Sequence, residues 1–160
     1  QSWTVAGRGT SMSSDIERVG GRNPAADLPG FSPVNIEQIL AWDPDILLLD
    51  DFEPGLAPAA LYEDSRYAGL RAVREKRVYA YPRGGFRWDP PSQESGLSLT
   101  WLQAIFHPKL AAPRFRETIA STYRSLYRHE LRAADIDQIL RLHDNGGSAQ
   151  YSALFAAGAA

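Results

Sequence analysis

Apolar residues follow two different spacings in the most regular stretch of the chain, residues 34–50. In its first half, Ile36, Ile39 and Leu40 recur at helical spacing and predict a helix with one apolar face toward the core. In its second half, residues 46–49 are apolar without alternation. Such a run is typical of a strand covered on both faces, as in a parallel sheet between helices. The stretch therefore predicts a helix followed by a buried strand.

The ends of this helix carry residues that begin and stop helices. Asn35 is a favourable N-cap residue, and Gln38 stands three positions later, as in a variant capping box. Pro44 disfavours helical geometry at the residue before it, so the helix is expected to end at Asp43.

The rest of the chain repeats this alternation of short apolar runs and helical patterns. We predict strands at 3–6 and 77–81, helical segments at 14–19, 58–62, 64–70, 92–106, 113–127 and 133–142, and a Pro- and Gly-rich loop at 23–33. Strands that alternate with helices predict an α/β fold, here three layers with a mostly parallel sheet flanked by helices.

Composition narrows the class of protein. The 160 residues suit one domain, and 44% hydrophobic with 22% charged residues is ordinary for a soluble globular protein. A net charge of -2 argues against sequence-independent binding of nucleic acid, which needs clustered positive charge. Without cysteine, the chain has no disulfide, thiolate metal site or cysteine nucleophile. No apolar run approaches the roughly 18 residues of a membrane span.

Two stretches could be binding sites, but a purely structural role is favoured for each. The Gly-Arg-Gly-Thr turn at 7–10 follows a strand, yet it matches no phosphate-binding pattern and is expected to be an ordinary turn into a helix. Asp50, Asp51 and Glu53 follow a strand, where a cation could bind, but they lack the spacing of a known cation loop. We expect a solvated turn there.

No catalytic machinery is evident. His107, His129 and His143 fall near three different helix ends, without the spacing of a zinc-binding helix, and are expected to stabilise those ends. The chain has no Gly-x-Ser-x-Gly elbow and no carboxylate pair with assignable roles. Enzyme activity is therefore not supported, and we predict no catalytic residue, metal ligand or cofactor.

The most unusual loop spans residues 82–92. It contains three prolines, Arg83 and Arg87, and the aromatic residues Phe86 and Trp88. A stiff loop with large side chains is well suited to bind a ligand. The alternative, which the sequence leaves open, is that Phe86 and Trp88 plug the end of the sheet.

Several of these motifs, in this order, resemble the C-terminal lobe of ABC-transporter substrate-binding proteins for ferric siderophores, haem and cobalamin. The resemblance covers residues 3–142. Its motifs are the Gly-Gly-x-Asn at 20–23, the stretch 34–46, Asp64-Ser65-Arg66-Tyr67, the strand at 76–79, and Trp88-Asp89-x-Pro91 before a long helix.

The resemblance implies a class III binding protein, with two α/β lobes joined by a long helix and a ligand held in the cleft between them. Residues 1–143 would form the C-terminal lobe and residues 144–160 a weakly structured tail. The N-terminal lobe would be missing from this chain. The protein would lie in the periplasm, or outside the cell and anchored to the membrane.

The resemblance also implies sites. By position, the ligand-binding residues would be Phe31, Arg83, Phe86, Arg87 and Trp88. Glu37 would dock onto the membrane permease. The ligand would be an iron-siderophore, haem or cobalamin-type chelate delivered to an ABC importer. The rivals are a molybdate- or tungstate-type oxyanion on the same fold, and a nucleotide-binding enzyme domain that uses the turn at 7–10.

Overall fold

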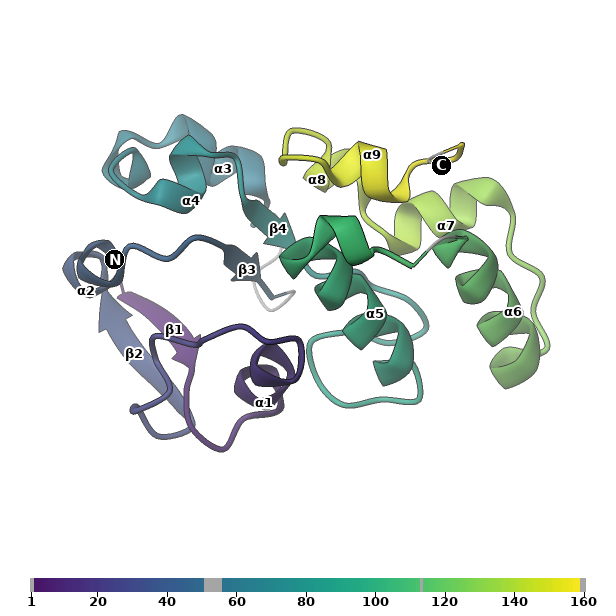
Figure 1. Ribbon diagram of the computed structural model, residues 1–160, viewed down its shortest axis with the longest axis horizontal. Helices are drawn as coiled ribbons and strands as arrows, with labels where there is room; N and C mark the ends of the chain where they lie inside the picture. The colour runs from purple at the N-terminus through teal and green to yellow at the C-terminus, as the bar shows by residue number, and fades with distance from the viewer. Residues whose placement is uncertain (1, 51–55, 113, 159–160) are drawn as a thin grey trace.

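The computed structural model describes residues 2–50, 56–112 and 114–158. Strands and helices alternate in its first half, and helices follow one another in its second half (Figure 1). The α-helices are α1 (Ser11–Arg18), α2 (Ile36–Trp42), α3 (Pro58–Glu63), α4 (Arg71–Arg74), α5 (Ser95–Phe106), α6 (Phe115–Tyr127), α7 (Ala133–Ile139), α8 (Leu142–Asn145) and α9 (Tyr151–Phe155), and the 3-10 helices are η1 (Ser65–Tyr67) and η2 (Pro108–Leu110).

The strands form two small sheets. β1 (Ser2–Ala6) pairs antiparallel with β2 (Phe31–Asn35). β3 (Leu47–Leu49) pairs in parallel with β4 (Val78–Ala80). The α/β class is confirmed, with the parallel pair near the centre of the molecule and helices around it (Figure 1). Within the described residues the expected sheet is thus divided into a parallel and an antiparallel pair.

The stretch 34–50 folds largely as predicted. The Asn35 side chain accepts a hydrogen bond from the backbone N–H of Gln38 at 2.9 Å, and α2 ends at Asp43, where φ is 39°. Ile39 is buried, but Leu40 is 38% exposed, so the prediction that it faces the core is wrong. The short helix buries one row of side chains, and Leu40 lies at the margin of that row, beside Gly69.

The prediction for the loop at 23–33 is wrong at its end. Residues 31–33 belong to β2, and Pro33 pairs with Thr4 of β1. Proline is tolerated because a strand in a two-stranded sheet has an edge that needs no backbone donor. α1 also starts earlier than predicted, since the Thr10 side chain caps it by accepting from the N–H of Ser13.

Two hydrophobic clusters form the core. One lies between β3 and β4 and helices α2, α3 and α4, and it includes Ile39, Leu61 and Val78. The other gathers β4, α5, α6, α7 and α9 around Trp101, which is fully buried. β4 contributes to both clusters, so the loop that follows it starts from a rigid strand. Among the described residues, no helix is long and apolar enough to cross a membrane.

The tail is better ordered than the sequence suggests. Tyr151 and Phe155 of α9 are 0% and 1% exposed. The Tyr151 hydroxyl accepts from the Trp101 indole N–H at 3.0 Å and donates to the carbonyl of Leu140 at 2.6 Å. The prediction of a weakly structured tail is wrong for these residues, because two aromatic anchors hold an otherwise alanine-rich segment against the core.

Candidate functional site

The loop after β4 folds back on itself as a tight hairpin. The N–H of Gly84 donates to the carbonyl of Phe86 at 2.9 Å, and the N–H of Trp88 donates to that of Pro82 at 3.2 Å. Arg83 and Arg87 face each other across the hairpin as a backbone bridge. The hairpin follows β4 directly, so it lies at the carboxyl end of a parallel strand, where α/β sheets commonly bind ligands.

A buried carboxylate lies beneath this hairpin. Glu94, just before α5, is 0% exposed and accepts three hydrogen bonds. The Trp88 indole donates at 2.7 Å, and the hydroxyls of Tyr123 and Tyr127 each donate at 2.6 Å. Burial, followed by the bond to Glu94, raises the pKa of both tyrosines, so both hydroxyls stay protonated and serve as donors.

Glycine is required where the hairpin passes over this carboxylate. A Cβ added to Gly84 would lie 1.9 Å from the Tyr123 hydroxyl and 2.0 Å from Oε2 of Glu94. A Cβ added to Gly85 would lie 2.9 Å from Oε1 of Glu94. The N–H of Gly85 also donates to the Tyr123 hydroxyl at 2.8 Å. The close approach therefore joins the loop backbone directly to the buried network.

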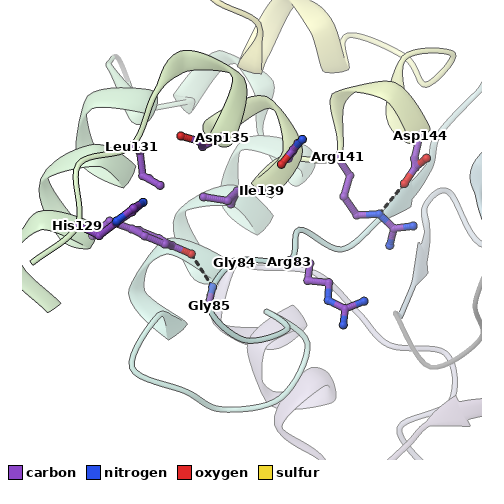
Figure 2. Close-up of a pocket in the computed structure, with 11 residues that line it drawn as sticks. Arg83, Gly84, Gly85, His129, Leu131, Asp135, Ile139, Arg141 and Asp144 are labelled. Atoms are coloured by element: carbon purple, nitrogen blue, oxygen red, sulfur yellow. Dashed lines mark hydrogen bonds and ion pairs between the residues drawn. The ribbon is translucent and has the colours of Figure 1, made fainter. Parts of the chain in front are cut away.

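A cavity of about 630 Å³ opens between the hairpin and helices α6, α7 and α8. Arg83 and Arg141 lie at one end of it and His129 at the other (Figure 2). The remaining lining residues are Gly84, Gly85, Tyr123, Leu131, Asp135, Gln138, Ile139 and Asp144.

The two carboxylates in this lining are engaged by arginines. Asp144 accepts from Arg141 at 2.7 Å (Figure 2). Asp135 pairs with Arg132 at 2.7 Å, and this contact lowers the pKa of its carboxyl to about 2. Arg83 also lines the cavity. The cavity therefore suits an anion or a polar ligand better than an apolar one.

Of the five residues predicted to bind ligand, four lie on the hairpin and Phe31 lies apart from them at the start of β2. Arg83 lines the cavity beside the hairpin, and Phe31 lines a second cavity of about 1020 Å³ next to β1 and β3. Phe31 and Phe86 are 58% and 50% exposed, but neither cavity contains both. Arg87 is largely covered and lies 3.6 Å from Asp89.

Trp88 does not line a cleft. It is 2% exposed and packs edge-on against Phe115 at 6.4 Å between ring centroids. A side chain buried to this extent within the lobe cannot form the wall of an open cleft, whereas Phe86 of the same loop is 50% exposed. The Trp88 indole ring is too large and apolar to stay in water when the start of α5 offers a buried acceptor, Glu94.

The remaining candidate sites are Glu37, the turn at 7–10 and the carboxylates that follow β3. Glu37 is exposed in the first turn of α2, which leaves it accessible to a partner. The turn at 7–10 is an ordinary helix entry, since Thr10 caps α1 and a Cβ on Gly7 would lie 2.2 Å from the carbonyl of Leu28. Asp51 and Glu53 lie outside the described residues. Elsewhere in the described chain, no group of three His, Asp or Glu could hold a metal ion.

Glu94 and its two tyrosine donors were not found from the sequence. Tyr123 and Tyr127 stand four residues apart in α6, on one helical face, and this spacing was the available signal. Nothing local marked Glu94 as buried, because glutamate rarely is. Its role depends on partners 29 and 33 residues away.

Comparison with known proteins places this geometry in a family. The periplasmic binding protein family matches residues 1–83, just over half of the chain. A solved periplasmic solute-binding protein from Veillonella parvula is 31% identical and superposes with a TM-score of 0.83, covering 89% of this chain and 45% of that protein.

A second similar protein has a named ligand. The molybdate-binding protein MolA of Haemophilus influenzae is 29% identical over an alignment of 120 residues, and the alignment covers 71% of this chain and 33% of that protein. The solved structure of MolA bound to molybdate superposes with a TM-score of 0.70 at 26% identity, covering 81% of this chain and 40% of MolA. The chain thus spans less than half the length of these relatives. It belongs to the periplasmic binding protein family and has the fold of one lobe of a class III binding protein.

Proposed function

We propose that this chain is the C-terminal lobe of the solute-binding protein of an ABC importer, and that the ligand is a small metal oxyanion of the molybdate or tungstate type. The observation that carries the proposal is the similarity to the molybdate-binding protein MolA over 71% of the chain. The lobe itself performs no catalysis. It works in the periplasm, or tethered outside the membrane, and releases its ligand to the permease.

The side chains of the hairpin favour an oxyanion over a bulky chelate. A siderophore or haem site needs aromatic walls that meet around the ligand. Here Trp88 is buried, and Phe31 lines the cavity of about 1020 Å³, whereas Phe86 lines neither that cavity nor the one beside the hairpin. Arg83 and Arg87, in contrast, stand opposite each other on one turn. Guanidinium groups bind tetrahedral oxyanions through pairs of charge-assisted hydrogen bonds, and Arg83, which is exposed and lines the cavity beside the hairpin, is the arginine best placed to do so.

A ligand panel tests this proposal on the full-length protein. Isothermal titration with sodium molybdate and sodium tungstate is expected to give dissociation constants of about 10 μM or tighter, that is, about -7 kcal/mol or more favourable. Ferric siderophore and haem are expected not to bind. Arg83→Gln should weaken molybdate binding at least about tenfold, because a charge-assisted hydrogen bond is worth about 1.5–3 kcal/mol.

Arg66→Gln is the matched control. Arg66 is also an exposed arginine, with 59% of its side chain accessible, but it pairs with Asp64 near η1 and lines neither cavity. Its replacement should leave molybdate affinity unchanged. Tight binding of a ferric chelate without molybdate binding would restore the siderophore reading and refute the oxyanion proposal.

Docking to the permease is a separate part of the proposal. Glu37 is exposed beside the N-terminus of α2 and would pair with arginines on the membrane protein. Glu37→Ala in the full-length receptor is expected to impair uptake, or receptor-stimulated ATP hydrolysis by the transporter, and to leave ligand affinity unchanged. Weaker ligand binding in this variant would contradict a docking role.

A further inference from the structure

We infer that Glu94 is a positioning residue that holds the 83–88 hairpin in its ligand-binding shape before any ligand arrives. The inference rests on the proposed function, since it assigns the hairpin to the ligand. Glu94 accepts hydrogen bonds from Trp88, Tyr123 and Tyr127. It therefore acts on Arg83 through the hairpin backbone and the Trp88 indole.

The bonding of Glu94 explains why a carboxylate occupies a fully buried position. An isolated charge there would be strongly destabilising unless several donors compensated for the lost water. Three donors do so, and they come from different parts of the chain: Trp88 from the hairpin, and Tyr123 and Tyr127 from α6. Glu94 itself is the N-cap residue of α5. One carboxylate therefore joins the loop to two helices.

The same network holds the hairpin at two points. At its far end, the Trp88 indole is bonded to Glu94. In its middle, the N–H of Gly85 donates to the Tyr123 hydroxyl, which in turn donates to Glu94. The residues between and beside these points include Arg83 and Phe86, both exposed.

The hydrogen bonds of Glu94 and Tyr123 therefore restrict the hairpin backbone that carries Arg83 and Phe86. An arginine pair binds an oxyanion tightly when its backbone is already ordered, because less conformational entropy is lost on binding. Replacement of Glu94 should therefore increase the mobility of the hairpin, and the affinity for the ligand should fall as a consequence.

A role limited to core stability makes a different prediction, and Tyr151→Phe provides the matched comparison. The Tyr151 hydroxyl is also a buried hub, bonded to the Trp101 indole and the Leu140 carbonyl. It has no bond to the hairpin. Its loss should lower global stability without releasing the loop.

The experiment compares Glu94→Ala, Glu94→Gln and Tyr151→Phe in the full-length protein. Amide hydrogen exchange without ligand is measured at Gly85 and Trp88, and sodium molybdate is then titrated. Glu94→Ala is expected to speed exchange at these amides at least about tenfold, because each buried hydrogen bond left unsatisfied changes an equilibrium by about that factor. Its molybdate affinity should fall by a similar factor.

The other two variants complete the test. Glu94→Gln keeps an acceptor for the Trp88 indole and should restore most of the slow exchange and the affinity. Tyr151→Phe should lose about as much thermal stability as Glu94→Ala. Its amide exchange at Gly85 and Trp88 and its molybdate affinity should stay near those of the natural protein. If Glu94→Ala does not fold, Tyr123→Phe replaces it, because that change removes the hydroxyl that joins Gly85 to Glu94.

Failure of the inference is distinct from failure of the proposed function. Equal loop exchange in Glu94→Ala and Tyr151→Phe would overturn the role of Glu94, whatever the ligand. Equal molybdate affinity in Glu94→Ala and the natural protein, despite faster exchange, would also overturn it. Absence of molybdate binding to the natural protein would refute the oxyanion function, while the exchange comparison would still decide whether Glu94 orders the loop.

Discussion

Replacement of Gly84 by alanine tests whether the hairpin depends on its close approach to Glu94. The added Cβ would lie 1.9 Å from the Tyr123 hydroxyl and 2.0 Å from Oε2 of Glu94, whereas real Cβ atoms do not come within 3.0 Å of other atoms. Tyr123 and Glu94 must therefore both retreat by about 1 Å or more, unless the hairpin itself shifts. Neither can move into solvent, because Glu94 is 0% and Tyr123 5% exposed.

The loss of stability comes from overpacking and from the hydrogen bonds that this displacement stretches. Overpacking of a well-filled site costs about 1–3 kcal/mol. Displacement of the Tyr123 hydroxyl also stretches its bonds to Glu94 and to the N–H of Gly85, and each buried bond lost costs about 1–3 kcal/mol. We expect Gly84→Ala to lower the free energy of unfolding by about 2–5 kcal/mol.

Gly96→Ala is the control, measured by the same urea titration. Gly96 lies in α5, and an added Cβ would meet nothing within 4 Å. Alanine should raise the free energy of unfolding by about 0.5–1 kcal/mol, because it is the better helix former. If the two variants differ in stability by less than about 1 kcal/mol, the hairpin does not rest on the Glu94 network as described.

Three further predictions concern single contacts. Trp88→Phe removes the indole donor from Glu94 and should lower the free energy of unfolding by about 1–3 kcal/mol in a urea titration; an unchanged stability would contradict the buried bond. Asn35→Ala removes the cap of α2 and should cost about 1 kcal/mol, whereas Asn35→Ser should cost much less. Asp135→Asn should lower the melting temperature at neutral pH. Because pairing with Arg132 depresses the pKa of Asp135 from 3.8 to about 2, its stabilising effect is complete above pH 3.8 and fades as the pH falls through about 2. A melting-temperature difference that is as large at pH 2 as at neutral pH would refute this assignment.

The elements predicted best are those with local signals. Asn35, Gln38 and Pro44 act through residues within four positions of themselves, and they placed the ends of α2 correctly. Apolar runs located β3 and β4 to within two residues. Local hydrogen bonds and steric restrictions can be predicted from the sequence, because the two interacting residues lie within one helical turn of each other.

The features that were missed depend on partners far along the chain. The sequence left open whether Trp88 faces a ligand or is buried, and its burial depends on Glu94, six residues later, and on Phe115 of α6. Tyr151 is ordered by a bond to Trp101, 50 residues earlier. The two arginines of the hairpin were identified correctly as loop residues, but their backbone bridge could not be read from spacing alone.

The most direct test of the account is a crystal structure of the full-length protein with sodium molybdate at stoichiometric concentration, with molybdenum located by its anomalous scattering. The account predicts one molybdenum peak at the 83–88 hairpin, with oxyanion oxygens about 2.9 Å from a guanidinium nitrogen of Arg83 or Arg87. A peak remote from both arginines, or a ferric chelate bound in place of molybdate, would contradict the account.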